Sequence, residues 1–400
     1  MLSESCKEKY DLSDGPARSL YVHVPFCRAK CRYCDFYSLP REEGLAGRYV
    51  RAVQAELALR RGELAVPLET IFVGGGTPTS LDLPLLRELL STLQSAIDHR
   101  QSAIGVEFSV EANPGTLTEK GTALLRECGV TRVNLGVQSL WDAELAVLGR
   151  IHSAAEAIEA VALLRQAGFE RPGLDLIYGI PGQTLGSWQD SLTAALDLRP
   201  GHLSCYALSF EPETPLLHDL QAARVKPMDD GLQRECYCLA IDLAASAGLE
   251  HYEISNFAAP SMRCRHNIVY WRNQPYLGLG PAAVSYVGGV RRKNEPDLGK
   301  YLQALESGCL PPTECERVTG RMAMAETMML GLRMIEGVDR SAFARRFGRD
   351  PVTAFPASLE RHRRIGSLLV NDQAIRIARP YLFVSDTILA DLIAEGAEAP

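Results

Sequence analysis

The sequence predicts an α/β fold in which repeated strand–helix units form a parallel sheet. Short apolar runs alternate with amphipathic segments over the first 250 residues, and polar or glycine-rich motifs follow five of these runs. Parallel strands with right-handed crossovers either close toward a barrel or form an open sheet. In both arrangements ligands bind at the carboxyl ends of the strands, so the motifs that follow the strands predict one common site.

Six strands and four intervening helices account for this alternation. Each apolar run has the short length of a buried strand, and each segment between runs has apolar residues at helical spacing. The strands are predicted at Ser19–Val24, Thr70–Val73, Val106–Glu111, Arg132–Val137, Leu174–Tyr178 and His202–Ser209. The helices are predicted at Leu83–Ile97, Leu117–Cys128, Ser153–Ala167 and Leu185–Leu198.

The alternation stops after a predicted helix at Asp229–Ala247. We therefore divide the chain into an N-terminal extension (1–18), a core (19–250), an extension of the core (251–315) and a C-terminal domain (316–400). The C-terminal domain is expected to be mainly helical, and a winged-helix-like arrangement fits its two short strands. Its elements are predicted at Thr319–Leu332, Ser341–Phe347, Ala354–Ile365, Leu368–Val370, Ala374–Ile377 and Ser385–Ala394.

Three cysteines follow the first predicted strand, in the segment PFCRAKCRYCDF. The chain has 11 cysteines, an odd number, and in a long chain of this kind we interpret them as thiols or metal ligands rather than as disulfides. Zinc would require a fourth ligand at a comparable spacing, whereas three thiolates suit an iron–sulfur cluster with one open iron. Cys27, Cys31 and Cys34 are thus candidate cluster ligands, and three ordinary thiols are the alternative.

Other polar residues follow the later strands. Gly74–Pro78 forms a glycine-rich turn that lets backbone groups approach a ligand closely. Glu111, Gln138, Arg150 and Asp175 lie at or just beyond strand ends, or in the helix that follows, and can form hydrogen bonds with a polar cofactor. Each could instead be a helix cap or an ion-pair partner, but their common register favours a binding site.

The CxxxCxxC spacing after an N-terminal strand resembles the signature of the radical S-adenosylmethionine (SAM) superfamily. In that superfamily SAM chelates the open iron of a [4Fe-4S] cluster, and one electron cleaves SAM to methionine and a 5′-deoxyadenosyl radical. The resemblance implies a partial (β/α)6 TIM-like barrel. Similarity to the oxygen-independent coproporphyrinogen III oxidase-like family further implies the cofactor contacts Tyr21, Gly75, Gly76, Thr77, Glu111, Gln138, Arg150, Asp175 and Ala207.

Within that family, the motifs between about Ser19 and Pro281 resemble the HemW subgroup of heme chaperones. Phe36 stands where the coproporphyrinogen dehydrogenase has a fourth cysteine. The segment before the first strand is also expected to be too short for that enzyme's N-terminal arm. Both features favour the chaperone subgroup over the dehydrogenase.

His266 begins an HNxxYW motif typical of this subgroup, and a neutral histidine is a suitable axial ligand for heme iron. A hydrogen-bonded structural role is the alternative, and Cys205 and Cys264 are weaker candidate ligands. Val284 departs from the family because HemW-like chains usually have histidine there, in GAHS. The sequence therefore leaves the axial ligand open.

The leading hypothesis is a heme chaperone that binds heme, a [4Fe-4S] cluster and SAM and delivers heme to an acceptor protein. The alternatives are coproporphyrinogen III dehydrogenation, another radical reaction such as methylation, and heme degradation. An electron donor such as flavodoxin or ferredoxin is implied. The sequence leaves open the acceptor, the presence of enzymatic activity, and the choice between a monomer and a homodimer.

The charge and hydropathy pattern narrows the class of protein. A net charge of -7 and a pI of about 5.7 argue against a constitutive nucleic-acid binder, which needs a basic face. No stretch approaches the ~20 apolar residues of a membrane span, and the first residues lack an apolar signal core. We therefore expect a cytoplasmic protein.

Overall fold

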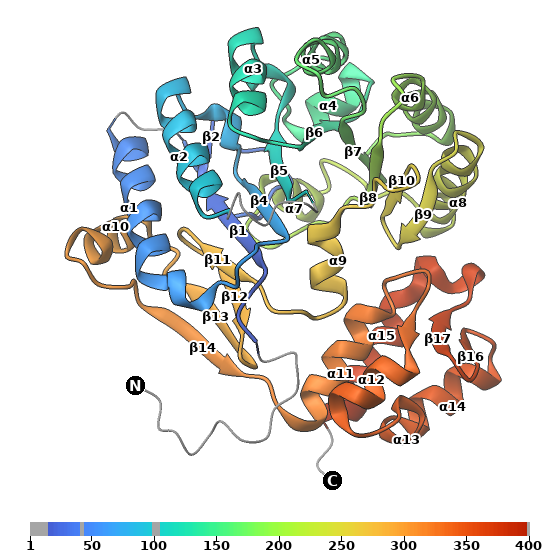
Figure 1. Cartoon of the computed structure of the whole chain (residues 1–400). Helices are drawn as coiled ribbons and strands as arrows, with labels where there is room; N and C mark the ends of the chain where they lie inside the picture. Colours follow the sequence, from blue (N-terminus) through green and yellow to red (C-terminus); the bar gives the residue numbers. More distant parts are fainter. Residues whose placement is uncertain (1–14, 41–43, 98–104, 398–400) are drawn as a thin grey trace.

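A curved nine-stranded sheet is the centre of the computed structural model, which describes residues 15–40, 44–97 and 105–397. The strand order is β11-β1-β4-β5-β6-β7-β8-β10-β9; the six strands from β1 to β8 are parallel, and β11 adds a seventh parallel strand beside β1. Since β11 and β9 are the two edges, the described sheet is a partial barrel (Figure 1). The six parallel strands are β1 (Ser19–Val24), β4 (Thr70–Gly75), β5 (Glu107–Ala112), β6 (Arg132–Gln138), β7 (Gly173–Tyr178) and β8 (His202–Ala207).

The six predicted strands and the parallel α/β fold are thereby confirmed, with shifts of one or two residues at half of the strand ends. Alternation explains how each strand packs: Leu20, Val22 and Val24 of β1 are fully buried in the hydrophobic core, while Tyr21 and His23 point to the opposite face. Helices cover the outer face (Figure 1). They are α1 (Leu45–Arg60), α2 (Leu83–Ser95), α3 (Glu119–Glu127), α4 (Asp142–Leu148), α5 (Ala154–Gln166), α6 (Leu185–Asp197) and α8 (Asp230–Ser246). The short helix α7 (Pro215–Gln221) lies instead inside this ring of helices, and its Leu216 N–H donates to the Arg32 carbonyl oxygen.

The segment after α8 completes the sheet. An antiparallel hairpin, β9 (Glu250–Glu253) and β10 (Asn256–Ala258), extends one edge beyond β8, and β11 (Leu277–Leu279) pairs in parallel with β1 at the other. Between them, the HNxxYW motif forms the short helix α9 (Arg265–Trp271). A single connection therefore reaches from one edge of the partial barrel to the other.

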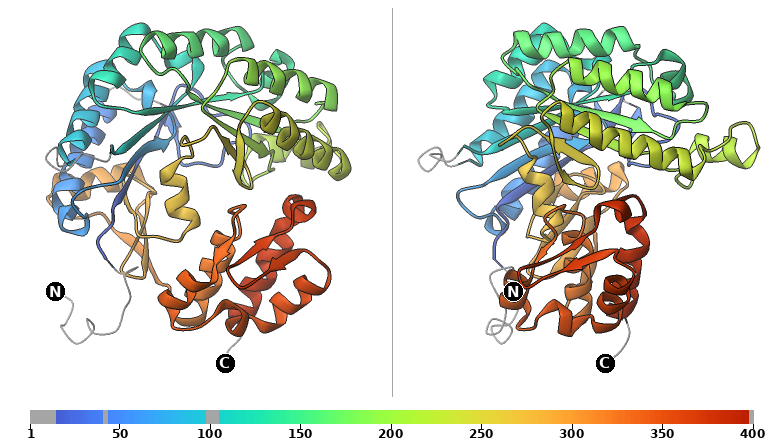
Figure 2. Two further views of the ribbon diagram at one scale, coloured as in Figure 1. Left: turned by 45° about the vertical axis from the view of Figure 1, so that its right-hand side comes forward. Right: turned by 90° about the vertical axis from the view of Figure 1, so that its right-hand side faces the viewer.

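Two further groups of strands and helices follow. A small antiparallel sheet and a helix that were not predicted pack beside α1: β12 (Val284–Val287), β13 (Val290–Asn294), β14 (Thr313–Arg317) and α10 (Leu298–Glu306). The proposed domain boundary at 315/316 falls inside β14, and that at 250/251 falls inside β9. The remaining elements form a mainly helical group at one end of the molecule (Figure 2): α11 (Gly320–Gly331), β15 (Val338–Asp339), α12 (Arg340–Phe347), α13 (Pro351–Ala354), α14 (Pro356–Arg364), β16 (Leu368–Val370), β17 (Ala374–Ile377) and α15 (Ser385–Ala397).

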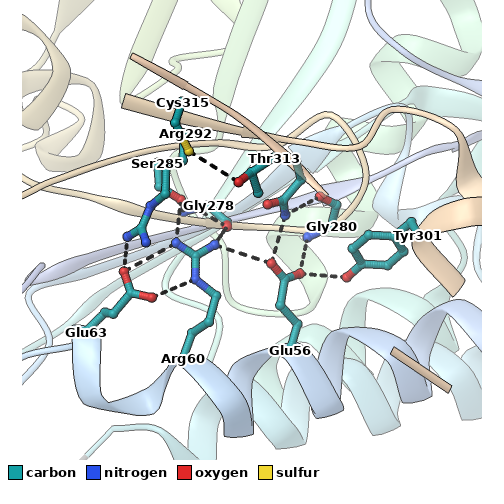
Figure 3. A network of polar contacts seen from close by, with 11 residues as sticks. Glu56, Arg60, Glu63, Gly278, Gly280, Ser285, Arg292, Tyr301, Thr313 and Cys315 are labelled. Carbon is teal, nitrogen blue, oxygen red and sulfur yellow. Dashed lines mark hydrogen bonds and ion pairs between the residues drawn. The ribbon is translucent and has the colours of Figure 1, made fainter. Parts of the chain in front are cut away.

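A buried polar network joins α1 to the small sheet (Figure 3). The Glu56 carboxylate is fully buried and accepts hydrogen bonds from the Gly280 backbone N–H at 2.9 Å, the Tyr301 hydroxyl at 2.7 Å and the Asn294 amide at 2.8 Å. Arg60, one turn further along α1, lies 3.4 Å away and supplies the compensating charge. One carboxylate of α1 thus binds β13, α10 and the turn that follows β11.

Replacing Glu56 by Leu should leave the buried donors of Gly280, Tyr301 and Asn294 without this acceptor and should remove one of the two carboxylate partners of Arg60, which keeps Glu63 at 3.0 Å. We expect a loss of about 3–5 kcal/mol in the free energy of unfolding, measured by urea denaturation. Glu306, whose ion pair with Arg48 is half exposed, provides the control: Glu306→Leu should change this free energy by less than about 1 kcal/mol. Equal denaturation midpoints for the two variants would contradict a structural role for the network.

Candidate cofactor-binding site

A cavity of about 440 Å³ lies at the carboxyl ends of the parallel strands. This is where a barrel of this type binds its ligands, because the loops that follow successive strands converge there. Most of the predicted site residues line this cavity, whereas Tyr21 and His266 do not. The lining members are Cys27, Cys31, Cys34, Gly75, Gly76, Thr77, Glu111, Gln138, Arg150, Asp175 and Ala207.

The three cysteines occupy one loop whose base is closed by strand pairing. Cys27 ends the two-residue strand β2 (Phe26–Cys27), which pairs with β3 (Leu39–Pro40). Burial raises the pKa of the Cys34 thiol to about 11, and the neighbouring cysteines add to this increase because adjacent thiolates repel one another. A positively charged iron centre would remove this penalty, so three thiolates on one cavity wall fit a [4Fe-4S] cluster with one open iron.

The glycine turn after β4 admits a ligand because side chains are excluded there. Gly75 has φ +103°, and a Cβ atom at this position would lie 2.6 Å from the His23 ring. A Cβ atom on Gly76 would lie 2.7 Å from the Phe26 carbonyl oxygen. Backbone packing therefore requires glycine at both positions, and the cavity wall beside Cys27 stays free of side chains.

Two carboxyl groups lie on the strand side of the cavity. Glu111 is the penultimate residue of β5 and accepts a hydrogen bond from the Gly75 N–H at 3.2 Å. Burial, together with the charge of Asp175, raises the pKa of Glu111 to about 8. Burial also raises the pKa of Asp175 to about 6, against the opposing charges of nearby arginines. A positively charged ligand such as SAM would oppose this increase in pKa and favour the ionised form of both carboxyl groups, which accepts hydrogen bonds.

Arg150 and Gln138 reach the cavity from the region of β6. Gln138 has φ +68° at the end of a strand whose register with β7 shifts, and such irregularities redirect side chains at binding sites. Arg150 donates to the Cys31 sulfur at 3.3 Å, to the Gly136 carbonyl at 2.8 Å and to Asn113 Oδ1. Asn113 also lines the cavity; it belongs to the EANPGT motif but was not predicted as a site residue.

Tyr21 lies behind the glycine turn. Its hydroxyl is 3.1 Å from His23 Nδ1, and the His23 ring is the group that a side chain at Gly75 would strike. In this structure Tyr21 supports the cavity wall through His23. A direct contact with the cofactor remains a prediction.

His266 lies near the opposite, amino-terminal end of the strands. Its Nδ1 is 2.7 Å from the Oγ1 of Thr70, the first residue of β4, and its Nε2 is 2.9 Å from the Tyr270 hydroxyl. The ring is fully buried and stacks on Phe72 at a centroid distance of 5.2 Å. This geometry favours the structural role, because a bond to iron would require the imidazole to leave one of its partners.

Phe36, which distinguishes this chain from the dehydrogenase, and the remaining positions considered for heme are divided between the cavity mouth and packed regions. Phe36 lines the mouth and is 63% exposed. Val284 begins β12 and does not line the cavity. Cys205 is buried in the core, and Cys264 lies buried at the start of α9, 3.6 Å from a Glu107 oxygen.

A partial parallel barrel with three cysteines at its ligand-binding end defines a radical SAM protein. The Radical SAM superfamily model matches residues 21–195, and the HemN C-terminal domain model matches residues 318–380. In addition, the fold resembles coproporphyrinogen III oxidase (HemN) of Escherichia coli, with a TM-score of 0.80 and 21% identity over 95% of this chain and 90% of that chain.

Similarity to whole proteins defines the family. The chain is 33% identical to the heme chaperone HemW of Bacillus subtilis over 94% of this chain and 100% of that protein. It is 38% identical to HemW of Synechocystis over 80% of this chain and 78% of that protein. The chain therefore belongs to the HemW family, which confirms the resemblance inferred from its motifs.

None of the helices in the described part of the chain has the length and apolar character that a membrane span requires.

Replacement of Cys27, Cys31 or Cys34 by Ser should abolish the cluster, since each would remove one thiolate ligand. Anaerobic reconstitution of the parent chain should give about four irons per chain, measured by iron and sulfide analysis. Cys128 is buried against α2, outside the cavity, so Cys128→Ser should retain the parent iron content. Equal iron in all four variants would refute the ligand assignment.

Alanine at Glu111, Gln138 or Asp175 should weaken SAM binding about tenfold or more, because each change removes a hydrogen bond worth roughly 1–3 kcal/mol. The measurement is equilibrium binding to the cluster-loaded chain under anaerobic conditions. Glu211, a cavity-lining carboxylate outside the predicted set, is the control, and Glu211→Ala should stay within about twofold of the parent. Unchanged affinity in the first three variants would exclude this cavity as the SAM site.

Proposed function

We propose that this chain is a heme chaperone that binds heme and passes it to an acceptor protein. The observation that carries the proposal is the similarity to proteins named as heme chaperones across almost the whole chain, from the cysteine loop to the C-terminal helices. The cavity supports it, because one site gathers three thiolates with the polar residues that SAM would require. Heme, the acceptor and an electron donor of the flavodoxin or ferredoxin type are parts of the proposal.

Different residues of the cavity would bind the cluster and SAM. When bound, the reduced cluster supplies one electron to SAM. Cys27, Cys31 and Cys34 would hold the cluster, and the side-chain-free wall at Gly75 and Gly76 would admit the cofactor beside it. Glu111, Gln138 and Asp175 would then orient the polar groups of SAM within the barrel.

Two separate places are candidates for binding heme, and they lie at opposite ends of the parallel strands. Phe36 and Ile151 line the mouth of the cavity and are each 63% exposed, so they offer apolar surface to a flat porphyrin. His266 is the candidate axial ligand from the HNxxYW motif, and ligation would require its Nε2 to exchange the Tyr270 hydroxyl for iron. Its burial favours the alternative, in which the motif only fastens α9 to the barrel.

Coproporphyrinogen III dehydrogenation is the second candidate function, because the fold resembles that of HemN. Phe36 argues against it, since the resemblance places a fourth cysteine at this position in the dehydrogenase. A phenylalanine side chain can neither ligate iron nor transfer a proton. The cofactor-binding half of the cavity is compatible with both functions.

The purified chain should bind heme at about one per chain and should fail to convert coproporphyrinogen III. Heme binding is measured by absorbance titration, and conversion by product analysis with SAM and a reductant present. Robust SAM-dependent formation of protoporphyrinogen IX would overturn the chaperone assignment in favour of the dehydrogenase. Absence of both heme binding and turnover would contradict both candidate functions.

His266→Ala should change the heme spectrum and weaken heme binding if the imidazole is the axial ligand. His362 provides a matched control because it is also a buried histidine with both ring nitrogens hydrogen bonded, to Ser367 at 2.9 Å and Asp391 at 2.9 Å. His362→Ala should leave the spectrum unchanged. A parent-like heme spectrum in the His266 variant would assign the HNxxYW motif to structure alone.

A further inference from the structure

The contacts around Arg150 have a fixed direction. A guanidinium has only donors, so the Asn113 side-chain atom that faces Arg150 must be the acceptor Oδ1. The amide of Asn113 therefore points its Nδ2 the other way, where it donates to Thr77 Oγ1 at 2.6 Å. One cation thereby determines how the Asn113 amide is oriented.

The same reasoning extends to Thr77. Its hydroxyl accepts from Asn113, so its single proton is free to be donated elsewhere. The Cys27 sulfur lies 3.6 Å from Thr77 Oγ1, and Thr77 is only 2% exposed, so water does not compete freely for this proton. Arg150 also donates directly to the Cys31 sulfur at 3.3 Å. One guanidinium thus acts on two of the three cysteine sulfurs, directly on Cys31 and through Asn113 and Thr77 on Cys27.

Two hydrogen-bond donors therefore face the cysteine loop. The Thr77 hydroxyl lies 3.6 Å from the Cys27 sulfur, and the Arg150 guanidinium lies 3.3 Å from the Cys31 sulfur. Donors that stabilise a thiolate also stabilise the more negative, reduced state of a cluster bound to it, which raises the reduction potential. The groups that face Cys27 therefore bear on how readily a cluster there would accept an electron.

We propose that Arg150, Asn113 and Thr77 form a hydrogen-bond relay that sets the reduction potential of the cluster, with Asn113 as a positioning residue. Asn113 acts through its two neighbours, because its amide donates to Thr77 and accepts from Arg150. The proposal rests on the cluster assignment within the proposed function and is independent of heme. Its test measures the potential directly and needs no turnover.

The test is a double-mutant cycle on the anaerobically reconstituted chain without heme. Thr77→Val removes the hydroxyl that faces Cys27. Asn113→Leu removes the amide that orients this hydroxyl, and the substitution adds no charge. In each variant the ratio of reduced to oxidised cluster at a fixed potential should fall about tenfold, a shift of about 59 mV for a one-electron couple, measured by redox titration with electron paramagnetic resonance. The double variant should show the same shift as Thr77→Val alone, because members of one relay are not additive.

Two variants serve as controls. Thr77→Ser keeps the hydroxyl and should restore the parent potential. Thr116→Val alters a neighbouring cavity residue whose hydroxyl binds the Asn113 backbone carbonyl at 2.7 Å, and it should also keep the parent potential. Parent-like potentials in Thr77→Val and Asn113→Leu, or fully additive shifts in the double variant, would overturn the relay. Failure of the parent chain to assemble a cluster would instead refute the proposed site, whereas absent heme binding would leave the relay intact.

Discussion

The common direction of six parallel strands is the constraint on which the rest of the structure depends. Because β1, β4, β5, β6, β7 and β8 all end at the same edge, loops that are far apart in the sequence meet in one cavity. The cysteine loop after β1, the glycine turn after β4 and Glu111 at the end of β5 become neighbours only through this geometry. Two of these segments are in direct contact, because the Gly75 N–H donates a hydrogen bond to the Glu111 carboxylate at 3.2 Å.

The opposite end of the partial barrel has a structural task. The Glu107 carboxylate, at the start of β5, accepts hydrogen bonds from the backbone N–H groups of Arg265 and His266, both at 3.0 Å. It thereby accepts from two backbone N–H groups that have no acceptor within the first turn of α9. Its negative charge also interacts favourably with the positive, amino-terminal end of the helix dipole. His266 then fills the space beside Phe72. The HNxxYW motif thus packs at the amino-terminal ends of the parallel strands, whereas the cluster and SAM are proposed to bind at their carboxyl ends.

Sequence patterns predicted the strands and most of the cavity because both depend on local signals. The strand at 19–24 matches its prediction at both ends, and CxxxCxxC, GGGTP and the residues after later strands all reach one site. The small sheet β12–β14 and helix α1 were missed. The sheet is stabilised by long-range contacts to Glu56 that no periodicity reveals, whereas Tyr49, Val53 and Leu57 give α1 a helical apolar spacing that could have identified it. Asn113 was missed because its partners come from the loop after β4 and from beyond α4.

Cys27, Cys31 and Cys34 are proposed to hold a cluster whose fourth iron is open to SAM. Mössbauer spectroscopy of the chain reconstituted with iron-57, recorded with and without SAM, tests it most directly, because it observes each iron environment separately. We expect the signature of a [4Fe-4S] cluster in which one of the four irons changes its isomer shift when SAM is added, while the three thiolate-ligated irons do not. A spectrum that is identical with and without SAM, under conditions where SAM is shown to be bound, would contradict the account.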